Sequence, residues 1–127
     1  MPALNYKAQF AEKVADGSKY HTIRAPRVNP IKKGDALMHY TGMRTSRCRK
    51  IRADTVCIGV TPIVILPMEA AVVLDTNSAY YRAGKFGLSE IRTLAQADGF
   101  ESAEAFFDWF AKTHGPEFIG NLIEWKP

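Results

Sequence analysis

Residues 52–65, RADTVCIGVTPIVI, are the stretch that most directly indicates how this chain folds. They are rich in valine, isoleucine and threonine, as buried or half-buried β-strands are. Pro62 has no backbone N–H to donate, so it predicts a sheet edge or a bulge at that position. The most apolar segment, Val56 to Met68, is interrupted by glycine and proline and is too short to cross a bilayer as a helix. We therefore expect a protein without a membrane anchor.

Further strands are predicted on both sides of this stretch. They are expected at Tyr20 to Arg24, Ala36 to Thr41, Ala70 to Asp75 and Phe118 to Trp125. Short strands with helices grouped apart favour an α+β fold built on a small mixed or antiparallel β-barrel. The 127 residues contain 46% hydrophobic side chains and no long linker, so a single domain over residues 1–127 is predicted.

Three helices are expected around these strands. The first is predicted to be capped by Asn5, to place Tyr6, Phe10 and Val14 along one face, and to end at Gly17. Ser89 is predicted to start a second helix, and Ser102 to cap a third. The third carries an aromatic stripe, which we interpret as part of the core rather than as a surface for stacking bases. Its members are Phe106, Trp109, Phe110 and Thr113.

The segment from Gly17 to Arg24, GSKYHTIR, brings an amine, a hydroxyl and a fixed cation close together in the chain. A hydroxyl is a poor nucleophile until a base removes its proton, and a desolvated lysine with a lowered pKa can be that base. On a regular strand Lys19 and Thr22 would face opposite sides, so they meet only if Lys19 still belongs to the turn at Gly17. The same residues are also typical of a solvated strand edge.

The charge of the chain is unevenly distributed. Residues 1–60 contain twelve lysines and arginines and four carboxylates, a balance of +8, whereas residues 61–127 have a balance of −4. A dense basic cluster near Tyr40 would attract phosphates, although a solvated loop that only improves solubility remains the alternative. Its members are Arg44, Arg47, Arg49, Lys50 and Arg52. Nucleotides or single-stranded RNA are therefore candidate ligands.

The cysteines and histidines predict neither a disulfide framework nor a metal site. Cys48 and Cys57 are the two cysteines, and the three histidines lack the spacing of zinc ligands. No N-terminal segment has the charged start and apolar run of a signal peptide. A cytoplasmic protein without metal or cofactor is the expectation.

Several short motifs, in this order and spacing, resemble the ASCH family of PUA-like domains. They include Gly17 to Arg24, Gly34-Asp35, Thr41 to Thr45 with Cys48-Arg49, and the C-terminal run from Ala95 to Trp125. The resemblance covers nearly the whole chain and implies a PUA-like barrel with flanking helices.

Some small bacterial members of this family are amidohydrolases that remove the acyl group from N(4)-acetylcytidine. The resemblance implies that their lysine and threonine correspond to Lys19 and Thr22, and that Asp98 stands where the family has a glutamate. Thr22 would attack the carbonyl or position a water, Lys19 would move the proton, and Asp98 would orient or discharge the lysine. Asp98 is one methylene shorter than glutamate, and Asp98-Gly99 is also a typical helix-stop pair.

The function that these patterns favour is therefore hydrolysis of N(4)-acylated cytidine or a related nucleoside. Arg24 is expected to bind the substrate carbonyl or to hold the base, with further substrate contacts from Tyr40, Arg44, Arg47 and Arg49. Two alternatives stay open: an RNA-binding PUA-like module without chemistry, and a ribonuclease acting on single-stranded RNA. A monomer or weak dimer is expected.

Overall fold

The computed structural model describes residues 2–74 and 87–126, which form an α+β fold. Within these residues there are six strands, three α-helices and one short 3₁₀ helix. In chain order they are β1 (Ala3–Tyr6), α1 (Ala8–Ala15), β2 (His21–Arg24), β3 (Ala36–Thr41), β4 (Arg49–Leu66), η1 (Pro67–Glu69), β5 (Ala71–Leu74), α2 (Leu88–Ala97), α3 (Ala103–His114) and β6 (Phe118–Trp125). The predicted α+β class is confirmed.

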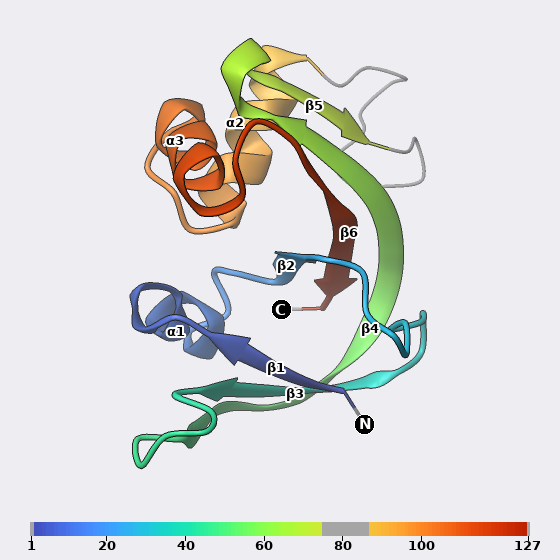
Figure 1. Ribbon diagram of the computed structural model, residues 1–127. Helices are drawn as coiled ribbons and strands as arrows, with labels where there is room; N and C mark the ends of the chain where they lie inside the picture. The colour runs from blue at the N-terminus through green and yellow to red at the C-terminus, as the bar shows by residue number, and fades with distance from the viewer. Residues whose placement is uncertain (1, 75–86, 127) are drawn as a thin grey trace.

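One continuous strand, β4, organises the sheet. It is 18 residues long and curves through both halves of the molecule, as Figure 1 shows. The strand order is β1-β3-β4-β6-β2, with β5 paired to β4, and only the β1–β3 pair is parallel. The edge strands β1 and β2 do not pair with each other in the described part of the chain. The sheet is therefore not closed there, and the expected barrel is not confirmed.

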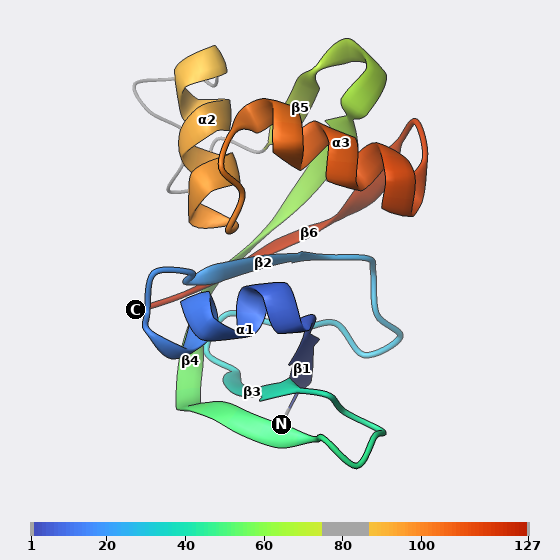
Figure 2. The ribbon, with the colours of Figure 1, turned by 90° about the vertical axis from the view of Figure 1, so that its left-hand side faces the viewer.

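Two clusters of buried hydrophobic side chains lie on this curved sheet. In the upper half, α2 and α3 pack on β4, β5 and β6, and Leu94, Phe106 and Leu122 are fully buried among them. In the lower half, α1 packs against β1, β3 and β4, with Val14 and Trp125 fully buried. Figure 2 shows β2 and α1 crossing the middle of the molecule below α3. The region where the two halves meet is therefore bordered by both cores.

The start of the chain differs from the sequence prediction. Asn5 and Tyr6 belong to strand β1, where Tyr6 is paired with Thr41 of β3, and the helix begins only at Ala8. The alternation of buried Leu4, exposed Asn5 and buried Tyr6 has the period of a strand with one face in the core. The spacing of Tyr6 from Phe10 suggested a longer helix, but pairing with β3 takes precedence. The predicted inward positions of Phe10 and Val14 are confirmed.

Most other predicted elements are confirmed, with shifts of a few residues at their ends. Pro62 lies where β4 has β6 on one side and, among the described residues, no strand on the other, because β3 pairs only up to Val56 and β5 only from Ile63. On that side Pro62 lies at an open edge of β4, as predicted. Of the strand predicted to reach Asp75, β5 accounts for Ala71–Leu74, and Asp75 lies outside the described residues. Among the described helices, none has the length and apolar character needed to cross a membrane.

Candidate functional site

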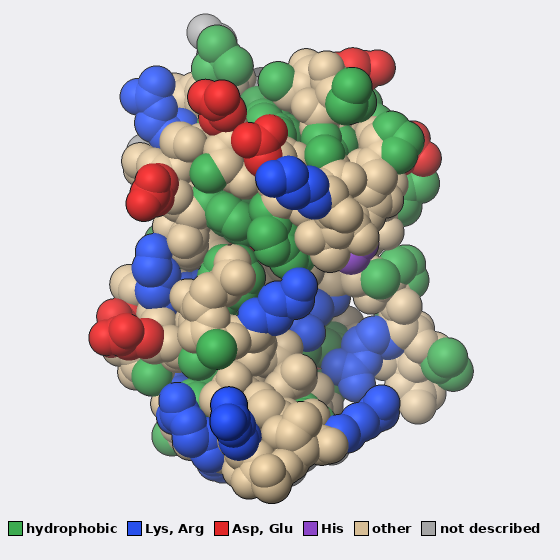
Figure 3. Space-filling model, turned by 60° about the vertical axis from the view of Figure 1, so that its left-hand side comes forward, with side chains coloured by type: hydrophobic (Ala, Val, Ile, Leu, Met, Phe, Trp, Pro, Cys, Tyr) green, Lys and Arg blue, Asp and Glu red, His purple; other side chains and the backbone are tan. Residues whose placement is uncertain are grey.

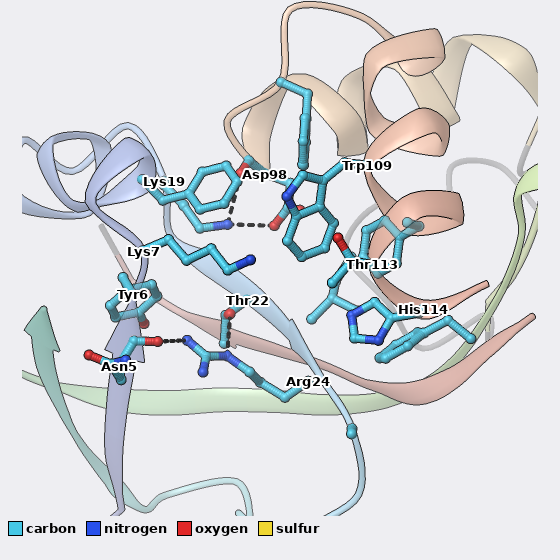
Figure 4. Close-up of a pocket in the computed structure, with 16 residues that line it drawn as sticks. Asn5, Tyr6, Lys7, Lys19, Thr22, Arg24, Asp98, Trp109, Thr113 and His114 are labelled. Carbon is cyan, nitrogen blue, oxygen red and sulfur yellow. Dashed lines mark hydrogen bonds and ion pairs between the residues drawn. The ribbon is translucent and has the colours of Figure 1, made fainter. Parts of the chain in front are cut away.

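A cavity of about 250 Å³ lies between the two halves of the molecule. Side chains from β1, α1, β2, the end of α2, and α3 line it, as Figure 4 shows. Of the residues predicted for catalysis and substrate binding, Lys19, Thr22, Arg24 and Asp98 all line this cavity. Residues from positions 19 and 98 are brought together only by the tertiary fold.

The turn after α1 places Lys19 in the cavity. Gly17 has φ of 86°, a left-handed conformation that glycine adopts without steric cost, and the Lys19 amide donates to the carbonyl of Lys13 at 2.9 Å. Lys19 therefore still belongs to the helix exit and precedes β2, which starts at His21. This removes the constraint that residues three apart on a strand face opposite sides. Lys19 and Thr22 line the same cavity, and both are buried.

The Lys19 ammonium contacts Asp98 at two points. Its Nζ lies 2.5 Å from Asp98 Oδ1 and donates to the Asp98 main-chain carbonyl at 2.9 Å. The Nζ also lies 5.3 Å from the centre of the Phe10 ring. Only 5% of the Lys19 side chain and 8% of the Asp98 side chain are exposed, so this ion pair is shielded from solvent.

The end of α2 holds Asp98 in place. Asp98 is the C-cap residue and donates its N–H to the Leu94 carbonyl at 2.9 Å. Gly99 follows with φ of 104°, and a Cβ there would lie 3.0 Å from the Phe10 ring. Lys13 of α1 donates to the Gly99 carbonyl at 3.1 Å. The predicted helix stop at Asp98-Gly99 is therefore present, and the same turn carries the carboxylate to Lys19.

His21 is a member of the site that we did not predict. It is fully buried, and its Nε2 lies 2.9 Å from Asp98 Oδ1, the same oxygen that Lys19 contacts. The first two residues of β2, His21 and Thr22, are both buried although they point to opposite faces of the strand. A strand that is covered on both faces buries every side chain, and a buried polar side chain needs a partner. Had β2 been recognised as such a strand, a buried partner for His21 would have been expected.

Burial and charge together set the proton affinities of this cluster. Burial lowers the pKa of Lys19, the Asp98 charge opposes this, and Arg24 and Lys13 reinforce the lowering, so the pKa lies below its ordinary value. Burial would raise the pKa of Asp98, but the charge of Lys19 and the contact with His21 outweigh it and hold the pKa below its usual range. Burial also lowers the pKa of His21. These shifts favour a carboxylate, a neutral imidazole and a lysine that deprotonates unusually readily.

Arg24 binds Thr22 rather than the base. Its Nε donates to Thr22 Oγ1 at 2.9 Å, and its Nη2 donates to the Asn5 carbonyl at 2.7 Å. The guanidinium also stacks over the Tyr6 ring, 5.0 Å from its centre. The Thr22 hydroxyl accepts from a fixed cation and keeps its own proton to donate. Such an arrangement stabilises negative charge that develops on this oxygen.

Tyr6 is in turn held by a buried network that the sequence did not reveal. Its hydroxyl lies 2.9 Å from His39 Nδ1, and His39 Nε2 lies 2.7 Å from Thr55 Oγ1. Thr41 donates to the Tyr6 carbonyl at 2.7 Å. Because β1, β3 and β4 each supply one part, only the strand pairing brings these residues together.

Aromatic rings form one wall of the cavity. Phe10, Phe100 and Trp109 contact one another, with ring centres 5.4 to 6.1 Å apart. Trp109 is only half buried, and the Lys7 ammonium lies 5.0 Å from its ring centre. The aromatic stripe on α3 thus has two roles: Phe106 is core, as predicted, whereas Trp109 lines the cavity. Thr113 also lines it and is exposed, contrary to a purely core stripe.

The other predicted substrate-binding residues lie away from the cavity. Tyr40, Arg44, Arg47 and Arg49 are on β3, in the β3–β4 turn and at the start of β4, and none of them is among the cavity-lining residues. A hydrogen bond from the Met43 amide to Asn5 Oδ1, at 3.1 Å, links the turn to the cavity rim.

Two residues of the basic cluster, Lys50 and Arg52, contact other parts of the fold. Lys50 pairs with Asp54 at 2.7 Å, and Arg52 donates to the Val14 carbonyl at 3.3 Å, where it meets the end of α1. Arg44, Arg47 and Arg49 are exposed. Figure 3 shows lysine and arginine side chains gathered on the lower half of the molecule. These three exposed arginines, together with the exposed Lys50, can reach a ligand.

We compared the chain with family models, curated proteins and solved structures, and none matched. The resemblance to the ASCH family therefore rests on the motifs of the sequence.

Proposed function

We propose that this protein is an amidohydrolase that removes the acyl group from N(4)-acylated cytidine or a related nucleoside. The observation that carries the proposal is the buried Lys19–Asp98 pair, which shares one cavity with the Thr22 hydroxyl. The three residues are those that the ASCH resemblance implies. The curved sheet also agrees with a PUA-like barrel, which remains part of the proposal.

The geometry supports an acyl-transfer sequence in which Lys19 moves the proton. In its neutral form, Lys19 accepts a proton from Thr22 Oγ1 or from a water as that oxygen attacks the acyl carbonyl carbon. Arg24, 2.9 Å from Thr22 Oγ1, stabilises the negative charge on this side of the cavity. The C–N bond then breaks, and the departing nitrogen takes the proton from Lys19. If Thr22 has attacked, a water hydrolyses the resulting ester.

The volume of the cavity and its aromatic lining support a small substrate that contains an aromatic ring. Its volume of about 250 Å³ lies below the range of roughly 300–1,000 Å³ that is typical of drug-sized ligands. Phe100 and Trp109 line the cavity and provide an aromatic wall against which a pyrimidine ring with a short acyl group can pack. We place the enzyme in the cytoplasm, as expected for a chain whose two cysteines, Cys48 and Cys57, are both free.

The test is an assay of deacylation with N(4)-acetylcytidine, in which released cytidine is quantified by chromatography. We expect the wild type to produce cytidine, and Lys19→Ala and Thr22→Ala to lower the rate by about a hundredfold or more. Lys33→Ala, which removes an exposed lysine that does not line the cavity, is the matched control. All rates are measured well below each variant's melting temperature, because Lys19→Ala leaves the Asp98 charge buried without its cation. Folded variants with near-normal turnover would contradict the proposal.

A second candidate function is supported by the exposed Arg44, Arg47 and Arg49. These side chains fit a phosphate backbone better than an uncharged nucleoside, which favours an RNA-binding module or a ribonuclease. Incubation with labelled single-stranded RNA separates the two: a retained complex supports the module, and shortened strands support the nuclease. A wild-type protein that releases cytidine and leaves RNA unbound and intact supports the amidohydrolase alone.

A further inference from the structure

We infer that His21 is a positioning residue that holds the Asp98 carboxylate against Lys19 and makes up for the short aspartate side chain. The inference rests on the proposed function, because it assigns His21 a role in the same deacylation site. It extends that function beyond the lysine, threonine and carboxylate that the family resemblance implies.

Lys19 Nζ and His21 Nε2 both contact the same carboxylate oxygen, Asp98 Oδ1. Asp98 Oδ1 lies 2.5 Å from Lys19 Nζ and 2.9 Å from His21 Nε2, and all three residues are buried. Lys19 and His21 are two residues apart, before and at the start of β2, so they approach the carboxylate together from one segment. The position of Oδ1 is therefore fixed by two contacts rather than one.

The backbone of Asp98 is held by contacts on both sides. The residue caps α2 through its bond to the Leu94 carbonyl, and the following Gly99 is packed against Phe10. Lys13 of α1 also binds the Gly99 carbonyl. With the main chain held on both sides, the orientation of the short side chain decides whether Oδ1 reaches Lys19. The His21 imidazole contacts the carboxylate in the orientation that does so.

A neutral imidazole suits this role. Burial lowers the pKa of His21, so near neutral pH the ring is uncharged and Nε2 can carry the proton that it shares with Asp98. The carboxylate then keeps its charge for Lys19, while a buried acceptor gains a second donor. A second cation at this point would instead compete with Lys19 for the same carboxylate.

Substitutions at position 21 test the inference through turnover. His21→Leu removes the donor, and we expect kcat to fall by roughly ten- to a hundredfold with little change in KM, as a misplacement of about an ångström does. His21→Gln, whose amide nitrogen reaches close to the position of Nε2, should retain most of the activity. His21→Leu combined with Asp98→Glu should recover activity, because the added methylene restores reach without the histidine.

A crystal structure of His21→Leu gives a readout that does not depend on turnover. We expect Asp98 to adopt another side-chain orientation and Oδ1 to move away from Lys19 Nζ, while the α2 terminus stays in place. If the wild type proves unable to deacylate N(4)-acetylcytidine, the proposed function fails and this structural arm still decides the role of His21. If His21→Leu does not fold, His21→Asn, which stays polar but ends short of Oδ1, replaces it in each arm. An unmoved Asp98, or unchanged kcat in the folded variant, overturns the inference.

Discussion

Lys19 is a buried ammonium group whose one carboxylate partner does not fully offset the loss of water. An exposed lysine holds its proton throughout the physiological range, whereas burial and the neighbouring Arg24 and Lys13 favour the neutral amine here. A base must be unprotonated to act, so in the proposed mechanism the environment that costs stability would also make Lys19 an effective base near neutral pH. Under the proposed function, the proton affinity of this one side chain would link the fold to the rate of deacylation.

The pH dependence of deacylation should follow this lowered pKa. At low pH Lys19 carries a proton and cannot accept another, so activity is low. Because its pKa lies below that of an exposed lysine, kcat/KM should rise through neutrality and stay high in mildly alkaline solution. A pH–rate profile of the wild type, with Lys33→Ala as control, checks this. Full activity far into the acid range would rule out a lysine base.

Asp98 provides the sharpest test of the third site position. Asp98→Asn removes the charge that faces Lys19 and should lower kcat strongly, while the amide keeps the volume of the side chain. Asp98→Glu restores the residue that the ASCH resemblance implies and should keep or raise activity. Parallel kinetics of the two variants, with melting temperatures as the check on folding, measure the effect. Complete loss in Asp98→Glu would show that a longer carboxylate does not fit beside His21.

The residues of the site were only partly predictable from the sequence. Lys19, Thr22 and Asp98 were predicted from short motifs, and they line one cavity because α1, β2 and the end of α2 converge there. His21 was missed because its role depends on a carboxylate 77 positions away, which spacing along β2 does not reveal. Tyr40 was assigned to the substrate from proximity to the basic cluster, but its strand does not line the cavity.

At the scale of the elements, the strands whose ends carry turn signals were predicted best. β3 and β6 have the predicted bounds, Ala36–Thr41 and Phe118–Trp125. Ser102 caps α3 as expected, accepting from the Ala105 amide at 3.1 Å. The first helix was predicted to start too early, because a periodic apolar pattern does not show that β3 will pair with Ala3–Tyr6. Local signals determine where an element stops, whereas its partners depend on the tertiary fold.

The β3–β4 turn should govern any binding of RNA without governing deacylation. Changing Arg47 and Arg49 to glutamine, and Arg44 to asparagine because its φ is 66°, removes three exposed charges. If each contacts a phosphate, the slope of log affinity against log salt should fall by about one unit per lost contact. Titrations with single-stranded RNA at several salt concentrations measure the slope, with Lys33→Gln as the control.

The outcome of this experiment also assigns the turn to one of the two candidate functions. Nucleoside deacylation should change little in these variants, because none of the three arginines lines the cavity. If the variants instead lose deacylation, and RNA binding is undetectable even at low salt, the turn stabilises the small-molecule site and does not bind RNA. The hydrogen bond from Met43 to Asn5 is the structural connection that would explain such a result.

The molecule as a whole contains a histidine whose burial connects its stability to pH. His39 is fully buried between Tyr6 and Thr55, and burial, reinforced by the charge of Arg52, lowers its pKa to about 4. In the unfolded chain the same histidine has its ordinary pKa of 6.5. Below that pH the unfolded state therefore binds the extra proton more readily than the folded state does. The contribution of His39 to stability is therefore complete above pH 6.5 and is lost as the pH falls through 4.

The free energy of unfolding should accordingly decrease in mild acid. Between pH 7.5 and pH 4, His39 alone should reduce it by roughly 3 kcal/mol, from a pKa difference of about 2.5 and 1.36 kcal/mol per unit. Urea unfolding of the wild type and of His39→Gln at a series of pH values gives the free energy of unfolding as a function of pH for each protein. The difference between the slopes of these two curves is the contribution of His39. Equal slopes in the two proteins would show that His39 does not carry the effect.

The overall arrangement was less predictable than its parts. A mixed α+β fold was predictable from the composition and from the order of strands and helices. Whether the sheet closes into a barrel was not predictable, and in the described residues the sheet is open. The curvature of β4 depends on how one long strand divides its partners, with β3 on its first half and β6 with β5 on its second. Neither β-propensity nor periodicity indicates where β4 changes partners, because all of its residues need only be compatible with an extended strand.

The pairing of β2 with β6 also determines when the site can be assembled during synthesis. Among the described strands, β2 pairs only with β6, so the segment that carries Lys19, Thr22 and Arg24 has no sheet partner until Trp125 has been translated. At typical rates of protein synthesis this interval is about 5 to 20 seconds. Throughout this interval the β2 segment lacks its sheet partner. Thr22 and Arg24, which lie on β2, can therefore reach their final positions in the cavity only after β6 has been made.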